Sequence, residues 1–126
     1  MTDFTMKKEA DGVAIIAWDC PGKSMNVLST EALMHLDTLI DDALADEAVK
    51  GIVITSGKKD FAGGMDLNVL AEMREGAGDS PEQGLFDGIM AMHAALRKIE
   101  RAGMDPKTLK GGKPIAAALP GTALGI

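Results

Sequence analysis

The stretch 51–70, GIVITSGKKDFAGGMDLNVL, most strongly limits what this chain can fold into. A β-branched run at 52–55 leads through a polar turn to two glycines, which stand just before an amphipathic segment that opens at Asp66. This order predicts a buried strand, a loop, a Gly-Gly bend and the start of a helix. Because glycine tolerates positive φ, we expect the amide N–H groups of Gly64, Met65 and Asp66 to point at one acceptor, as in an oxyanion or phosphate site. The simpler alternative is that the Gly-Gly pair is only a turn.

The spacing of apolar residues along the rest of the chain predicts an α/β domain with a largely parallel sheet. The expected elements are a hairpin (3–9 and 13–18), a helix that begins at Ser29 or Thr30, a strand at 52–55, a short helix over 66–73, a long helix over 85–102 and a buried strand at 114–119. The Gly, Pro, Ser and Glu content of 74–84 predicts a mobile loop beside the Gly-Gly bend.

Composition excludes several classes of protein. A chain of 126 residues is one domain at most, and its net charge of −6 with scattered lysines and arginines argues against a nucleic-acid surface. The single cysteine, Cys20, excludes an internal disulfide, and no apolar run approaches the roughly 20 residues that a membrane-spanning helix needs. The N-terminus lacks the apolar core of a secretion signal, so we expect a cytoplasmic protein.

The usual catalytic motifs are missing from the sequence. It has no G-x-S-x-G, H-E-x-x-H, paired cysteines, phosphate-loop or dinucleotide-binding signature, so nucleophilic, zinc and dinucleotide chemistry lack support, and we expect no metal site. His35 and His93 both fall within predicted helices, where a single histidine is more often a surface or packing residue than a catalyst.

Two further blocks accompany the Gly-Gly bend. The first is Asp19-Cys-Pro-Gly-Lys-Ser-Met-Asn-Val-Leu-Ser29, and the last is Lys113-Pro-Ile-Ala-Ala-Ala-Leu-Pro-Gly-Thr-Ala-Leu-Gly-Ile126. Three such blocks in this order resemble the crotonase superfamily of enoyl-CoA hydratases and isomerases. The W-D-x-P-G-x-S-M-N-V form of the first block most resembles the N-terminal hydratase half of the multifunctional fatty-acid oxidation proteins, whose other half is a 3-hydroxyacyl-CoA dehydrogenase.

The resemblance covers nearly the whole chain and implies a fold. It is a crotonase-like ββα-type core with a largely parallel sheet and flanking helices, of which residues 1–126 would be the N-terminal part. The chain stops on an apolar run with no cap and no polar tail, so we expect a truncated domain. By the same resemblance, the glutamates that activate water in the hydratases would follow Ile126.

The resemblance also implies site residues. Two backbone N–H groups, those of Met65 and Ile126, would form the oxyanion hole for a thioester carbonyl. The residues implied to contact the acyl-CoA are Lys23, Ser24, Met25, Ala62, Gly63, Gly64, Asp66, Leu67, Gly121, Leu124 and Gly125. The chain departs from the family in having Ile126 where glycine is usual and Pro120 where asparagine is common.

Two of these residues have a simpler alternative role. Lys23 either reaches a CoA phosphate or is a solvated loop lysine. Asp66 is better read as a helix cap than as a general base, because the positive end of a helix lowers the basicity of a carboxylate.

Three functions remain open from the sequence. The first is hydration of a 2-enoyl-CoA in β-oxidation, with double-bond isomerisation as the nearest variant; the second is a non-catalytic acyl-CoA-binding or scaffold domain; the third is a plain α/β interaction domain. No cofactor is expected in this segment, and NAD only if a dehydrogenase half follows. The implied partners are the acyl-CoA or enoyl-CoA substrate and either further copies of the chain or a thiolase-containing complex.

Overall fold

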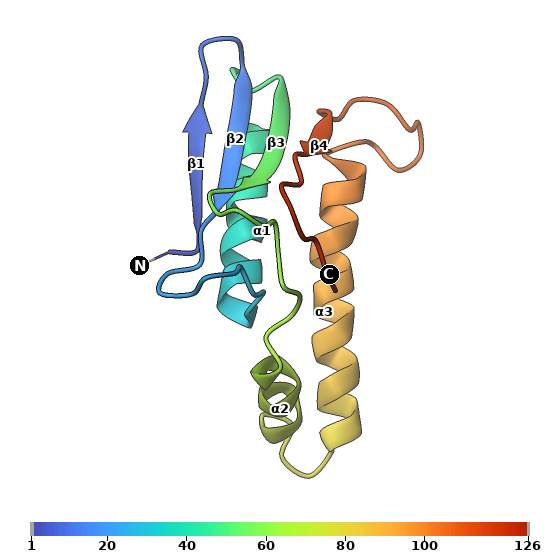
Figure 1. The fold of residues 1–126 in the computed structure, drawn as a ribbon. Helices are drawn as coiled ribbons and strands as arrows, with labels where there is room; N and C mark the ends of the chain where they lie inside the picture. Colours follow the sequence, from blue (N-terminus) through green and yellow to red (C-terminus); the bar gives the residue numbers. More distant parts are fainter. Residues whose placement is uncertain (1, 126) are drawn as a thin grey trace.

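The structure is a computed structural model that describes residues 2–125. Its elements, in chain order, are β1 (Phe4–Lys8), β2 (Val13–Trp18), α1 (Thr30–Ala45), β3 (Gly51–Ser56), α2 (Asn68–Glu75), α3 (Pro81–Arg101) and β4 (Ile115–Ala117). The strands form one sheet in the order β1-β2-β3-β4, with β1 antiparallel to β2 and the other neighbours parallel. The predicted hairpin and the largely parallel α/β sheet are therefore confirmed. Helix α1 lies against this sheet, while α2 and α3 form a helical hairpin beside it (Figure 1).

The core lies between the sheet and α1. On β2, Ala14, Ile16 and Trp18 are buried and alternate with more exposed neighbours, as expected for a strand with one covered face. From α1, Leu36 and Ile40 are buried in the same cluster. The apolar spacing of both elements thus sets which faces meet.

Ser29 begins α1, as the sequence predicts. Its backbone is extended, and its hydroxyl oxygen accepts a hydrogen bond of 3.0 Å from the amide of Ala32. This contact satisfies one of the amide groups that the first helical turn leaves without a partner.

The predicted loop over 74–84 is too long. Helix α2 continues to Glu75 and α3 already begins at Pro81, so only 76–80 connects them. Proline is well suited to the first turn of a helix, because its fixed φ is helical and its missing N–H would have had no partner there. The mobility of this shorter connection stays a prediction. The predicted starts of these helices, at 66 and 85, were also wrong by a few residues.

The prediction of a buried last strand is wrong as well. Ile115 is half-buried, whereas Ala116 and Ala117 are exposed, and β4 forms the edge of the sheet within residues 2–125. The neighbouring α3 has no fully buried residue, and its apolar side chains Phe86 and Leu96 are 59% and 37% exposed. An apolar pattern alone does not say whether another element covers it.

Candidate functional site

The Gly-Gly bend and the last block lie side by side. The amides of Phe61 and Ala62 both donate to the carbonyl of Thr122, at 2.9 and 3.1 Å, and the amide of Leu124 donates to the carbonyl of Ala62 at 3.1 Å. Gly64 has a φ of +106°, and a Cβ added there would lie 3.5 Å from the Leu124 carbonyl oxygen. The positive φ therefore explains the glycine, while a Cβ at this position would make only an ordinary contact with the second segment.

The first block borders the same bend through main-chain contacts. The amide of Leu28 donates to the Gly64 carbonyl at 2.9 Å, and the amide of Asp66 donates back to the Leu28 carbonyl at 2.9 Å. The expectation of three convergent amides is thus wrong for Asp66, whose N–H already has an acceptor. Within residues 2–125, no acceptor is paired with the amides of Gly64 and Met65. These two N–H groups are the ones that a ligand oxygen could use.

The second predicted donor, the amide of Ile126, lies outside the described residues. Its neighbours can be placed: Gly125 has a φ of +63°, and a Cβ added there would lie 3.4 Å from the Cα of Gly64. The oxyanion hole as a pair of donors stays a prediction.

Asn26 holds this corner in place and is the residue that sequence reasoning missed. Its side chain is completely buried, and the two N–H groups of its amide are shared among three acceptors: the Trp18 carbonyl at 3.1 Å, the Ser56 hydroxyl at 2.9 Å and the Phe61 carbonyl at 2.9 Å. Its oxygen accepts from the amide of Cys20 at 2.8 Å. One side chain therefore connects the ends of two strands to the segment before the Gly-Gly bend. An Asn in the loop between a predicted strand and a predicted helix was the available signal.

Lys23 and Asp66, both predicted to contact the ligand, contact each other. The Lys23 ammonium lies 3.2 Å from a carboxylate oxygen of Asp66, with half of the lysine side chain exposed. The Asn68 amide donates to the other carboxylate oxygen at 3.0 Å. This N–H and then the Lys23 ammonium lower the pKa of Asp66. A carboxylate held in its charged form in this way is a poor general base, consistent with a capping role.

The remaining residues predicted to contact the ligand differ in packing and exposure. Met25 packs close to Gly63, since a Cβ added at Gly63 would lie 3.5 Å from the Met25 methyl carbon. Leu67 and Leu124 are mostly exposed, at 83% and 59%, and Ser24 is exposed too. Gly121 packs directly against Asp60 and leaves no room for a side chain there. The turn that it makes is therefore enough to explain a glycine at this position. Nothing in these positions tests ligand contact.

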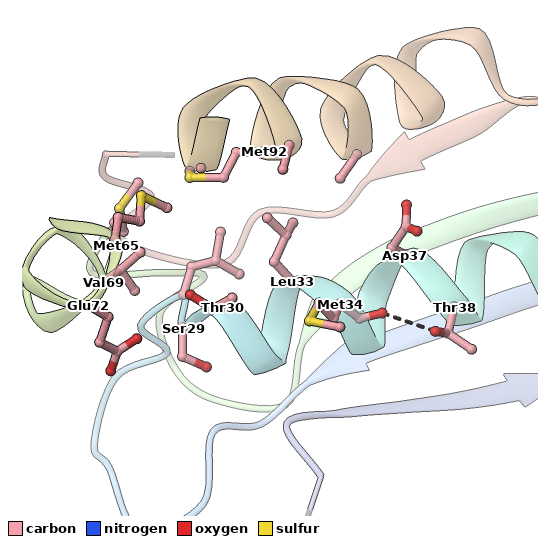
Figure 2. A pocket seen from close by; sticks show the side chains of 15 residues that line it. Ser29, Thr30, Leu33, Met34, Asp37, Thr38, Met65, Val69, Glu72 and Met92 are labelled. Carbon is pink, nitrogen blue, oxygen red and sulfur yellow. Dashed lines mark hydrogen bonds between the residues drawn. The ribbon is translucent and has the colours of Figure 1, made fainter. Parts of the chain in front are cut away.

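An apolar groove begins at Met65. It has a volume of about 630 Å³ and runs between the start of α1, α2 and the facing side of α3. Figure 2 shows Leu33 pointing from α1 toward α3, with Met65, Val69 and Met92 on the α2 and α3 side. The sequence did not predict this groove, because its walls come from three helices that are brought together only in the folded chain. Its four methionines, at 34, 65, 73 and 92, were the available signal.

Acidic residues near the corner do not form a catalytic pair. Asp60 accepts a 2.8 Å hydrogen bond from the amide of Thr122, and this N–H lowers the pKa of its carboxyl. Asp66 is committed to Asn68 and Lys23 as described above. No group of His, Cys, Asp and Glu within residues 2–125 is arranged to hold a metal ion, and no helix in this range is long and apolar enough to cross a membrane.

Curated proteins with similar sequences share one area of metabolism. The chain is 30% identical to a "Fatty acid oxidation complex subunit alpha" of Shewanella halifaxensis over 125 residues, which are 97% of this chain and 15% of the relative. It is 36% identical to the "Peroxisomal fatty acid beta-oxidation multifunctional protein MFP2" of Arabidopsis thaliana over 115 residues, or 90% of this chain and 16% of the relative. The chain thus spans about 15% of the length of the curated relatives that it matches. No protein-family model matches it.

Solved structures show the same fold. An enoyl-CoA hydratase from Shewanella pealeana superimposes with a TM-score of 0.78 over 98% of this chain and 41% of that chain, at 15% sequence identity. An enoyl-CoA hydratase/isomerase (crotonase) from Legionella pneumophila superimposes with a TM-score of 0.75 over 96% of this chain and 41% of that chain, at 20% identity. These likenesses confirm the predicted crotonase-like fold.

Proposed function

The chain resembles the crotonase superfamily in both sequence and fold, and from this premise we propose that it binds a fatty acyl-CoA thioester. We further propose that it serves an enzyme that hydrates 2-trans-enoyl-CoA to 3-hydroxyacyl-CoA in β-oxidation. The relatives matched in sequence are fatty-acid oxidation proteins, and the matched structures include enoyl-CoA hydratases. Because the chain spans about 15% of the length of its curated relatives, their activity enters here as a proposal.

One observation carries the proposal. The Met65 amide has no acceptor within residues 2–125, and Met65 also lines the apolar groove. A thioester carbonyl at this amide would place the acyl chain at the entrance of the groove. A single hydrogen-bond donor aimed at the developing enolate oxygen typically stabilises the transition state by about 3 kcal/mol. Ile126 is the proposed second donor.

Ligand recognition would continue on the other side of the corner. Lys23 lies on the loop that resembles the CoA-binding segment, and its ion pair with Asp66 is partly exposed to solvent. An exposed pair of this kind contributes little to stability, so the ammonium can exchange partners at small cost. We propose that it turns to a CoA phosphate when ligand binds.

Hydration also needs a general acid and a general base. Asp60 and Asp66 have lowered pKa values, so neither is suited to accept a proton from water near neutral pH. The acid and base groups would come from outside residues 2–125. The same proposal has further parts. They are isomerase activity, an NAD-dependent dehydrogenase in the same polypeptide, assembly into a homo-oligomer or a thiolase-containing complex, and a cytoplasmic location.

The same observation favours a second candidate function. A domain with a thioester corner but without a carboxylate pair could bind acyl-CoA without catalysis, as a carrier or scaffold. This candidate and the hydratase share the binding step and differ in turnover alone.

Calorimetry tests the binding step. Acetoacetyl-CoA, which presents an enolate-like thioester, should bind to the chain more tightly than free CoA and far more tightly than pantetheine. Equal affinity for the three compounds, or no binding by any, would leave a plain α/β interaction domain as the better description.

A further inference from the structure

A second cavity adjoins the apolar groove. It has a volume of about 380 Å³ and lies between α2, the connection 76–80 and the start of α3. Glu72, Met73 and Gly88 line both cavities, so these residues form the wall between them. Glu72 is exposed, which leaves Met73 and Gly88 as the inner part of the wall.

Met73 is packed directly on Gly88. A Cβ added at Gly88 would lie 2.6 Å from the Met73 sulfur and 2.8 Å from its Cγ. The thioether of Met73 therefore occupies space on α3 that is open only because residue 88 is glycine. Methionine is unbranched and flexible, so the wall that it forms can be moved by changes of one or two atoms.

The second cavity is not closed to an aliphatic chain. Its polar lining residues are Glu72, Ser80, Gln83 and Asp87, and Gln83 donates a hydrogen bond of 2.8 Å to Asp87. The rest of the lining includes the small residues Gly76, Ala77 and Gly84. A methylene chain that passed Met73 would meet mostly aliphatic surface.

We propose that Met73, seated on Gly88, sets the length of acyl chain that the groove accepts. This inference rests on the proposed function, since it assigns the groove to the acyl chain of a CoA thioester whose carbonyl lies at Met65. Chains that end before Met73 are fully accommodated. Longer chains have to displace the thioether or leave the groove.

Binding of a series of saturated acyl-CoAs tests this proposal. Butanoyl-, octanoyl-, dodecanoyl- and hexadecanoyl-CoA are titrated by calorimetry, below their micelle-forming concentrations, with CoA as the reference. For the unchanged protein, affinity should rise by about fourfold for each methylene that is buried and then level off. In the Met73→Ala variant, the affinity should stop rising at a longer chain length. We expect this variant to bind hexadecanoyl-CoA about tenfold or more tightly than octanoyl-CoA.

Two further variants make the test specific. Gly88→Ala adds a methyl group to the shared wall. In this variant the affinity for acyl-CoA should stop rising at a chain length no longer than in the unchanged protein. Met90→Ala changes a half-exposed methionine of α3 that lines neither cavity, and should leave the whole series unchanged. If Met73→Ala levels off at the same chain length as the unchanged protein, the proposal is overturned while acyl-CoA binding stands. If no variant prefers any acyl-CoA to CoA, the proposed function fails with it.

Discussion

Asn26 shows how one buried polar residue can hold several chain segments together. Its four hydrogen bonds join the ends of β2 and β3 to the segment before the Gly-Gly bend. Because the side chain is completely buried, removing it would take away the partner of the Cys20 amide and of the Phe61 carbonyl, whereas the Trp18 carbonyl still accepts from the Gly57 amide.

We therefore expect Asn26→Ala to lower the free energy of unfolding by about 3 kcal/mol. Urea denaturation followed by circular dichroism measures the change. The matched control is Asn68→Ala, at an exposed position, which should change the free energy by less than about 0.5 kcal/mol. Equal effects of the two substitutions would contradict this role for Asn26.

Gly64 combines positive φ with the close approach of a second segment. Gly64→Val forces a β-branched residue into a strained conformation, at a cost of about 1–3 kcal/mol, and crowds the Leu124 carbonyl. We expect loss of acetoacetyl-CoA binding with a moderate loss of stability, measured by calorimetry and by urea denaturation.

A matched control separates strain from site geometry. Gly78 also has positive φ, at +57°, but has open space around it and lies in the connection between α2 and α3. Gly78→Val should lose stability and keep ligand binding. Full ligand affinity in Gly64→Val would remove the Met65 amide from the site.

Asp66 carries the pH dependence at this corner. Its pKa is lowered first by the Asn68 amide and then by Lys23, from an ordinary value of 3.8. A lowered pKa means that the charged carboxylate stabilises the fold above the ordinary value, and that this contribution is lost as the pH falls through the lowered pKa. Carbon NMR of the carboxyl group should find its titration midpoint below 3.8.

Lys23→Ala should then raise the pKa of Asp66 only part of the way, because the Asn68 amide remains. Asp60 serves as the internal reference in the same spectra, since its pKa is lowered by the Thr122 amide and not by Lys23. A midpoint for Asp66 that does not move when Lys23 is removed would show that the ion pair is absent in solution.

At the scale of elements, the two long helices begin in different ways. Ser29 caps α1 with its hydroxyl, whereas Ser80 precedes α3 without a capping hydrogen bond from its side chain. Helix α3 begins with Pro81 instead, and its neighbour Glu82 suits the positive end of the helix.

This difference predicts unequal effects of the same substitution. Ser29→Ala should lower the free energy of unfolding by about 1 kcal/mol, because an amide of the first turn loses its partner. Ser80→Ala should change it by a few tenths at most. Thermal and urea denaturation of the two variants decide the point, and a larger loss at Ser80 would mean that its hydroxyl caps α3 in solution.

At the scale of the whole molecule, the proposed acyl-CoA binding and the proposed hydration depend on different groups. Residues 2–125 bring the Gly-Gly bend, the last block and an apolar groove together, but they provide no free carboxylate pair at the corner. The exposed apolar side chains of α3 and the exposed edge at β4 lie in the same described part of the chain.

We expect the 126-residue chain to bind acetoacetyl-CoA without hydrating crotonyl-CoA. Loss of ultraviolet absorbance of the enoyl thioester measures turnover, with an established enoyl-CoA hydratase as the positive control. Turnover by the chain, above the uncatalysed rate and abolished by Gly64→Val, would show that acid and base groups are present within it.

Local patterns in the sequence determined most of the helices and strands, and whether neighbouring strands pair in a parallel or an antiparallel way. The alternation in β1 and β2, the capping residue Ser29 and the apolar face of α1 each depend on neighbours within a few residues, so the hairpin, α1 and β3 could be predicted. The Gly-Gly bend could be predicted as well, because the positive φ of Gly64 is a local property, whereas the ligand-contact residues were implied by the resemblance.

Only the tertiary structure decided what those local patterns contact. Four features depend on residues that are far apart in the chain. They are the buried hydrogen bonds of Asn26, the hydrogen bond from the Asp66 amide to the Leu28 carbonyl, the exposure of β4 and the groove between three helices. Burial and hydrogen-bond partners are properties of the assembled fold, since an apolar or polar side chain gains them only when another element is brought against it. For that reason the sequence predicted a binding corner at Met65, and the structure alone revealed the groove that leads from it to Met73.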